Sequence, residues 1–463
     1  MKQKRTVLIL SMLISLLMLG AHATVMAGVS AEKAAKLNTT LTPFGAERAG
    51  NADGTIPAWE EGITEVPAGY EPGKRHIDPY ANDQVLYTIT AANMDKYADK
   101  LAEGSKELLK RYPDTFRLDV YQTRRSFSAP QWVYDNTIKN ATRAGLSEDG
   151  YSVSGAFGGI AFPIPKRPEE VMWNFLTRYY GKDEHYSFDI CVISPNSKPV
   201  IVSGSEVRAM NPYYDQDLGI EDFYAKKTPE YFLVLNQFIS PPRRKGEVIL
   251  GRDPLDQSKN SRKAWQYLPG QRRVRRAPTI AYDTPNPGAS GLMTYDDVFM
   301  FNGALDRYDW KLIGKKEVYI PYNCYKAETK ASLEELCHAH HPNPEYWRWE
   351  LHRVWVVEGS LKSGKRHVYA KRVNYIDEDS WSLAIRDVYD AQGSLWRHAY
   401  AGLKNAYELP GVVDRPNVYI DFYRPEYLYH FSMTRYDRIP LYNTGDVTEK
   451  YFTPEKVRRL GKR

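Results

Sequence analysis

The densest group of side chains that could bind a metal is the run Cys337-His338-Ala339-His340-His341, with Cys324 upstream. Thiolate and imidazole groups are ligands that zinc prefers. Adjacent residues on a helix point apart, however, and the run lacks the two-residue spacings that are typical of zinc sites. We therefore expect neither a metal nor another cofactor.

Two acidic runs, Asp296-Asp297 and Asp377-Glu378-Asp379, could supply acid-base chemistry. A catalytic pair of carboxylates must face one bond across several ångströms, whereas adjacent carboxylates on a strand or turn diverge. We therefore interpret both runs as solvated turns. The sequence also lacks a Gly-x-Ser-x-Gly elbow and a His-Glu-x-x-His motif. No catalytic residue is assigned, and the sequence favours a protein without enzymatic activity but leaves the question open, since a triad built from distant residues would leave no such motif.

Residues 262–278, RKAWQYLPGQRRVRRAP, predict a hairpin with one apolar side and a cationic edge. Trp265 and Tyr267 share a face of the first strand, and Val274 lies in the returning strand. That strand carries four arginines: Arg272, Arg273, Arg275 and Arg276. Two interpretations stay open, namely charges that protect a sheet edge against pairing and a surface that docks on anionic lipid head groups or an acidic partner.

The elements that would position these residues change in type near Gly181. Before Gly181, the apolar spacing and the capping residues predict helices over 94–112, 130–144 and 168–180. A short basic helix is also expected near the carboxyl terminus, at 453–460. After Gly181, a period of two predicts strands over 186–193, 199–207, 231–240, 246–251, 263–268, 272–276, 349–358, 365–376, 381–389, 395–400, 417–422 and 427–436.

Short polar connections between the later strands predict an antiparallel meander. In 231–240 both alternating sets are apolar, so that strand should be covered on both faces, by helices on one side and by a cavity or plug on the other. The predicted fold is α+β and mostly antiparallel β, a large curved sheet or unclosed barrel plugged by helices. The predicted organisation is a signal peptide (1–27), an extended arm (28–90), a helical layer (91–181) and the sheet with helical insertions (182–463), with 28–463 packed as one domain.

The amino terminus predicts export. The basic start MKQKR precedes an apolar run over residues 6–20, which is typical of a secretory signal peptide cleaved near Ala27. A membrane anchor would need about 20 apolar residues, and this run is shorter. Without residues 1–27 the formal charge falls from +6 to +3, because three basic and no acidic residues are lost. A chain whose positive and negative charges nearly balance is not expected to bind nucleic acid. From the signal peptide, we expect the protein in the periplasm.

In an exported chain, Cys324 and Cys337 predict a disulfide, with Cys191 left as a buried thiol. The alternative, three unpaired buried thiols, stays open because cysteine also behaves as a small apolar residue.

Two sets of passages resemble known families. The unit WQYLPGQRRVRR and the meander with its acidic turn 377–380 resemble the periplasmic lipoprotein carriers LolA and LolB. Over nearly the whole mature length the chain is similar to an uncharacterised proteobacterial family labelled outer-membrane lipoprotein-sorting protein, through LTPFGAERAGNADGTIPAW, GQRRVRRAP, DDVFMFNG, RYDWKLIGKKE and LHRVWVVE. The resemblance implies an unclosed barrel around an apolar cavity for acyl chains or a similar lipid. The chain departs from the small carriers in its greater length, its long amino-terminal arm and its lack of a lipidated cysteine.

The expected function is a periplasmic carrier or chaperone that binds a lipid-like ligand by apolar burial, for envelope or outer-membrane trafficking. The expected cavity wall is Phe232, Val234, Trp265, Tyr267, Val274, Trp355 and Trp381, with Arg272, Arg273, Arg275 and Arg276 at the rim or docking surface. Each wall residue also fits an ordinary core. Two alternatives are a periplasmic hydrolase acting on a lipid or polymer, and a structural partner of an exporter or outer-membrane complex. Expected partners are a hydrophobic small molecule, an outer-membrane or exporter protein, and the membrane surface.

Overall fold

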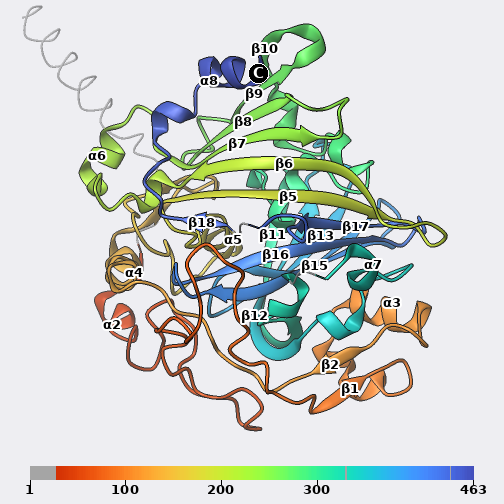
Figure 1. Ribbon diagram of the computed structural model, residues 1–463. Coiled ribbons are helices and arrows are strands. Elements are labelled where there is room, and N and C mark those ends of the chain that lie inside the picture. The colour runs from red at the N-terminus through yellow and green to blue at the C-terminus, as the bar shows by residue number, and fades with distance from the viewer. Residues whose placement is uncertain (1–27, 329–330, 438–439, 463) are drawn as a thin grey trace, which may run out of the picture.

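One large sheet organises the chain (Figure 1). The computed structural model describes residues 28–328, 331–437 and 440–462, so the predicted signal peptide lies outside the described residues. Within them the sheet has 16 strands, nearly all antiparallel, which confirms the predicted fold class. Its path runs β1 (Tyr87–Ile89), β2 (Leu118–Val120), β12 (Trp349–Leu361), β13 (Lys371–Asp377), β14 (Leu383–Tyr389), β15 (Leu395–Ala406), β16 (Gly411–Asp421), β17 (Tyr427–Ser432), β5 (Asp183–Ile193), β6 (Val200–Met210), β7 (Glu230–Ser240), β8 (Val248–Pro254), β9 (Lys263–Leu268) and β10 (Arg273–Arg276).

Three further pairings complete the β structure. β11 (Tyr308–Pro321) pairs with β12, and β18 (Leu441–Tyr442) pairs with β5. β3 (Gly145–Leu146) and β4 (Val153–Ser154) form a separate small ladder. The meander β12 to β17 joins the earlier strands through β17 and β5, where Leu428 lies opposite Val192. This pairing makes one curved sheet from two segments that are far apart in the sequence.

Helices and short 3-10 turns lie around the sheet. The α-helices are α2 (Ala31–Ala34), α3 (Glu103–Arg111), α4 (Gln131–Arg143), α5 (Pro168–Leu176), α6 (Gly219–Ala225), α7 (Leu333–Leu336) and α8 (Pro454–Gly461). The 3-10 turns are η1 (Met94–Lys100), η2 (Pro212–Tyr214), η3 (Pro269–Gln271), η4 (Pro278–Ala281), η5 (Pro287–Ala289), η6 (Tyr295–Met300), η7 (Leu305–Arg307), η8 (Tyr325–Glu328), η9 (Pro344–Tyr346) and η10 (Glu449–Tyr451).

The structure confirms three predicted helices and corrects one. α4 and α8 match the expected positions, α5 begins as expected but ends at Leu176, and Thr453 caps α8 by accepting from the Lys456 amide. The helix predicted over 94–112 is interrupted, because the buried Leu101 has an extended backbone (φ −113°, ψ 136°) between η1 and α3. Burying Leu101 and Ala102 against the core outweighs continuous helix here.

β7 is apolar on both faces, and both are covered as predicted. On one face Leu233 and Leu235 pack in a cluster with Val457 of α8. On the other face Phe232 and Val234 line a cavity. The carboxyl-terminal helix therefore supplies the outer layer over this half of the sheet, where Figure 1 shows α8 beside β9.

The predicted disulfide is wrong. In the described part of the chain Cys191, Cys324 and Cys337 are all buried free thiols. The Cys324 thiol donates to the Arg348 carbonyl oxygen at 3.4 Å, and burial raises the pKa of both Cys324 and Cys337 to about 12. Both side chains therefore act as small core residues. Among the described helices, none has the length and apolar character needed to cross a bilayer.

Candidate functional site

A cavity of about 110 Å³ lies on the inner face of the sheet. Its strand wall takes side chains from four neighbouring strands, among them Phe188 of β5, Val207 of β6, Val234 of β7 and Ile249 of β8. Such a wall follows from the alternation of side chains along each strand. A cavity of about 150 Å³ can hold benzene, so this space fits a small apolar group.

The opposite wall comes from residues 280–302 and from β17. Phe299 of η6 and Phe431 of β17 stack there, with ring centroids 5.2 Å apart. A second cavity of about 30 Å³ shares Phe232, Phe299 and Asn302 with the first. Phe232 meets Phe299 edge to face at 6.2 Å. These shared side chains form the partition between the two cavities.

The charged groups at the cavity are neutralised locally. Arg262 donates from Nε and Nη2 to the Asp253 carboxylate, with Nη2 3.0 Å from Oδ2, and also from Nη2 to Asn302 at 2.6 Å. His430 is 2% exposed. Burial, aided by the nearby Arg415, lowers the pKa of His430 to about 3, so its imidazole is neutral. The cavity is therefore an uncharged space.

The structure brings together only part of the predicted wall. Phe232 and Val234 line the cavity, but Trp265, Tyr267 and Val274 pack on the opposite face in the cluster under α8. The register explains this correction: Trp265 lies opposite Leu250 and Tyr267 opposite Val248, and both β8 residues face α8.

The two predicted tryptophans of the meander lie elsewhere. Trp355 and Trp381 stack at 6.1 Å. The Trp381 indole donates to the Phe44 carbonyl oxygen at 3.0 Å, and Lys315 lies over the Trp355 ring at 4.9 Å. Trp381 therefore holds the amino-terminal segment on the sheet, and neither tryptophan lines the cavity.

The wall residues that the sequence analysis missed include Tyr186, Phe188, Phe299, His430 and Phe431. The alternation over 186–193 could have indicated Phe188. Phe299 lies in a 3-10 segment with no periodic pattern, and His430 follows no motif.

Three of the predicted arginines lie on β10, the last strand of the sheet path, Arg272 directly precedes it, and all four are exposed. β10 pairs with β9, and the guanidinium of Arg276 lies 5.2 Å from the Trp265 ring. α8 packs against β9 and β10 and adds the exposed Arg458 and Arg459. We call these six side chains the basic edge: Arg272, Arg273, Arg275, Arg276, Arg458 and Arg459.

The acidic runs are buried, which corrects the expectation of solvated turns. Asp377, Glu378 and Asp379 are at most 2% exposed. Arg125 donates to both Asp379 oxygens, from Nε at 2.9 Å and from Nη2 at 2.6 Å, and Lys315 contacts Glu378 at 2.7 Å.

The other acidic run is paired in the same way. Asp296 lies 2.6 Å from Arg372, and Asp297 lies 2.7 Å from Arg386. Cations from distant segments replace water at both runs, so the carboxylates are structural ion-pair partners.

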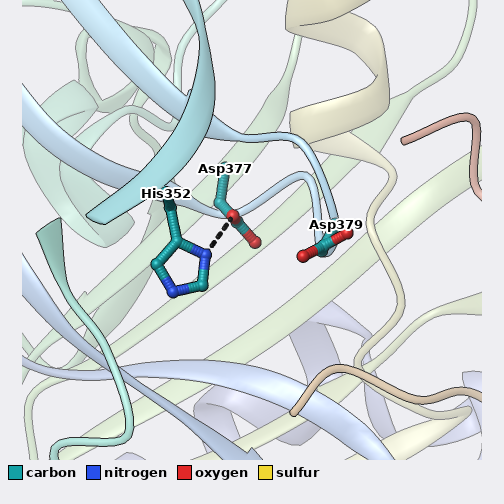
Figure 2. A group of neighbouring side chains, drawn as sticks. All are labelled: His352, Asp377 and Asp379. Atoms are coloured by element: carbon teal, nitrogen blue, oxygen red, sulfur yellow. Dashed lines mark ion pairs between the residues drawn. The ribbon is translucent and has the colours of Figure 1, made fainter. Parts of the chain in front are cut away.

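Within the described residues, one group of side chains has the donor atoms that a metal site needs: His352, Asp377 and Asp379. These donor atoms lie within 4.8 Å of one another, and Figure 2 shows the three side chains. Arg125 already occupies both oxygens of Asp379. His352 lies 3.1 Å from Glu350 and 3.5 Å from Asp377. Burial alone would lower the pKa of His352, but these two carboxylates raise it to about 9. The cluster fits a protonated imidazole better than a metal ion.

A serine, a histidine and an aspartate also meet in the manner of a hydrolase triad. His398 Nδ1 lies 2.6 Å from Asp387, and its Nε2 lies 3.5 Å from the Ser105 hydroxyl. All three side chains are at most 1% exposed. A Cβ on Gly104 would approach His398 Nδ1 to 2.1 Å, so α3 sits directly on the imidazole. This arrangement leaves no room for a substrate and instead seats α3 on β14 and β15.

Comparisons with known proteins agree on a family without an assigned activity. The family model described as a protein of unknown function (DUF1329) matches residues 88–458. The chain is 40% identical over 449 residues to the uncharacterized protein PA3922 of Pseudomonas aeruginosa, covering 95% of each chain.

Similar solved structures include a candidate outer-membrane lipoprotein-sorting protein domain from Vibrio parahaemolyticus (15% identity, 63% of this chain and 97% of that chain, TM-score 0.41). They also include a DUF1329 family protein from Desulfovibrio piger (14%, 60% and 92%, TM-score 0.39) and a LolA superfamily protein from Nitrosomonas europaea (11%, 63% and 100%, TM-score 0.37). On the extent of the family match and the identity to the Pseudomonas protein, the chain belongs to the DUF1329 family.

Proposed function

We propose that the protein is a periplasmic carrier that binds a lipid-like hydrophobic molecule on the inner face of β5 to β8. The observation that carries this proposal is the unequal covering of β7. Its Leu233 and Leu235 face is closed by α8, whereas its Phe232 and Val234 face borders an apolar cavity. A strand that is apolar on both sides but fully packed on only one leaves a place for a second apolar molecule.

The size of the cavity sets a condition on the ligand. Burial of a group the size of a leucine or phenylalanine side chain contributes about 1.5–3 kcal/mol. A dissociation constant of 1 mM already requires about 4 kcal/mol. A carrier therefore needs its ligand to extend past the first cavity, and the neighbouring space behind Phe232 and Phe299 is the extension that we propose.

The wider setting of the carrier is also a proposal. The charge pattern of residues 1–27 supports export to the periplasm. Contacts from Arg125 to Asp379 and from α3 to β15 support packing of 28–181 with the sheet as one domain. The exposed arginines of the basic edge support peripheral contact with an anionic membrane surface.

Lipid extraction from natively purified protein tests the proposal. The mature chain, purified from cell envelopes without detergent, is expected to release a hydrophobic molecule in roughly equimolar amount, measured by native mass spectrometry and by mass spectrometry of a solvent extract. The emptied protein should then bind hydrophobic probes. Protein that carries no extractable molecule and binds no probe would rule out the carrier function.

A further inference from the structure

Two polar atoms in the cavity wall lack hydrogen-bond partners among the described residues. They are Asn236 Oδ1 of β7 and His430 Nδ1 of β17, and both are buried. A buried polar atom left without a partner costs about 1–3 kcal/mol. β5 and β6 lie between β7 and β17 in the sheet, so the two atoms occupy separate points of the cavity lining. Neither atom is exposed, so a molecule in the cavity gains either hydrogen bond only when that side chain rotates its unpaired atom toward the cavity.

The chemistry of the two atoms narrows the ligand. The amide oxygen of Asn236 accepts hydrogen bonds only. The neutral imidazole of His430 can donate or accept at Nδ1, according to its tautomer. A hydroxyl group satisfies either atom, because it both donates and accepts. A ligand ether or halogen cannot donate to Asn236.

Charged ligands fit the wall poorly. Arg262, the cation in the wall, is held by Asp253 and Asn302. The nearby Arg415 pairs with Glu184 at 2.8 Å and lies over the Tyr186 ring at 4.0 Å. Its Nε and Nη1 also lack partners, but the side chain is not part of the cavity wall. A buried carboxylate would therefore lose hydration without gaining a counterion.

We propose that the cavity binds the hydroxyl-bearing end of an uncharged hydrophobic molecule, a long-chain or ring alcohol, whose hydroxyl pairs with Asn236 or His430. This inference rests on the proposed carrier function and adds the chemical class of its ligand.

Three eight-carbon probes test the class on the delipidated mature chain at pH 7.5. Octan-1-ol, octanoate and 1-chlorooctane share the apolar chain and differ in the end group, and their affinities are compared by native mass spectrometry and calorimetry. Octan-1-ol should bind most tightly, and octanoate at least about tenfold more weakly, because its charge stays unpaired.

Two variants locate the polar contact. Asn236→Leu and His430→Phe keep similar shapes and remove both polar atoms of each side chain. At least one of them should lower the affinity for octan-1-ol by about two- to tenfold, which is the effect of one hydrogen bond. The affinity for 1-chlorooctane should stay unchanged or increase. Gln237→Leu is the matched control, since Gln237 is the next residue of β7 and is not part of the cavity wall. Thermal unfolding checks that each variant folds.

The outcomes separate the two proposals. If octanoate binds as tightly as octan-1-ol, or if both folded variants bind octan-1-ol like the wild type, the ligand class is wrong and the carrier function stands. If none of the three probes binds, both proposals fall. If a variant does not fold, the comparison of the three probes on the wild type still decides the class.

Discussion

Phe299 and Phe431 stack at 5.2 Å with an interplanar angle of 20°, and both residues have left-handed backbones, with φ values of 53° and 61°. This conformation costs a non-glycine residue on the order of 1 kcal/mol or more. Packing on both sides must hold it in place. Because Phe299 also borders the second cavity, the strained pair lies where the proposed ligand would have to pass.

A smaller side chain in the partition between the two cavities should allow a longer ligand to bind. We expect Phe299→Leu to join the two cavities in part. In a series of alcohols that runs from hexan-1-ol to dodecan-1-ol, the chain length that binds most tightly should then increase by one or two methylenes. Each added methylene contributes about 0.8 kcal/mol when it is buried. Calorimetric titration of the series measures the shift. Phe116→Leu is the control, a buried phenylalanine that packs on His341 at 5.1 Å; an unchanged optimum in Phe299→Leu would contradict the partition.

Filling the first cavity should remove binding without unfolding the protein. Val234 lies opposite Gly251 on β8, and a Cβ there would meet Val234 Cγ1 at 3.2 Å, so the Val234 side chain covers this glycine beside the cavity. In Val234→Phe the larger ring is expected to occupy the cavity and to weaken the binding of octan-1-ol at least about tenfold. The melting temperature should stay unchanged, because unfilled core space is itself destabilising. Val200→Phe, at a site that is 52% exposed, is the control. Wild-type affinity in Val234→Phe would place the ligand elsewhere.

Local patterns predicted the layers of this fold. The meander follows from period-two alternation with short polar turns, and the double covering of β7 follows from its two apolar faces. The pairing of β17 with β5 could not be predicted, because contacts between distant strands leave no local pattern. β11 was missed, although Asp309 to Leu312 alternate charged and apolar residues as a half-buried strand does.

The same limit applies to the candidate site. Trp265, Tyr267 and Val274 do share one face, as alternation predicted, but the direction of that face depends on α8 at the far end of the chain. The acidic turn at Asp377 was predicted to be solvated, because the partners that bury it, Arg125 and Lys315, come from other segments. Sequence patterns therefore locate faces of strands, and tertiary contacts decide which face is inside.

The basic edge should direct the protein to anionic membranes. Each exposed arginine near such a surface contributes about 1 kcal/mol, and salt weakens the attraction. We expect sedimentation with phosphatidylglycerol vesicles but not with phosphatidylcholine vesicles, and loss of this binding when Arg272, Arg273, Arg275 and Arg276 are replaced by glutamine.

A charge-matched control separates docking from general charge. It replaces the exposed Lys33, Lys36, Lys110 and Lys139 by glutamine, on helices or turns away from β10. If this control loses as much vesicle binding as the β10 variant, the basic edge is not a docking surface. Concentration-dependent association of the β10 variant would instead support protection of the sheet edge.

Arg125 is expected to be essential for stability because its loss would leave the buried Asp379 unpaired. Both side chains are 2% exposed and joined at 2.6 Å. Breaking such a pair costs about 3–5 kcal/mol, so Arg125→Met should lower the free energy of unfolding in urea by that amount. Lys106→Met, which removes a more exposed pair with Glu103 at 2.9 Å, should cost less than about 1 kcal/mol. Equal costs would show that the Arg125 pair is not structurally important.

His352 should make stability depend on pH in the alkaline range. The carboxylates of Asp377 and Glu350 overcome the effect of burial and raise its pKa from 6.5 to about 9. The folded state therefore holds the proton more tightly than the unfolded state does. The resulting stability is fully present below pH 6.5 and is lost as the pH rises through 9. Burial lowers the pKa of Lys404 to about 7, which acts in the opposite direction over the same range.

The contribution of His352 is best measured as a difference, because Lys404 is common to both proteins. The free energy of unfolding of the wild type minus that of His352→Gln should fall by on the order of 2–3 kcal/mol between pH 6.5 and 9. His185→Gln, at the partly exposed pair with Glu206, serves as the control histidine. If the difference for His352→Gln is constant across this range, His352 is not protonated in the folded protein. Its position between two carboxylates must then be stabilised in another way. Metal analysis of the purified protein would be the next measurement.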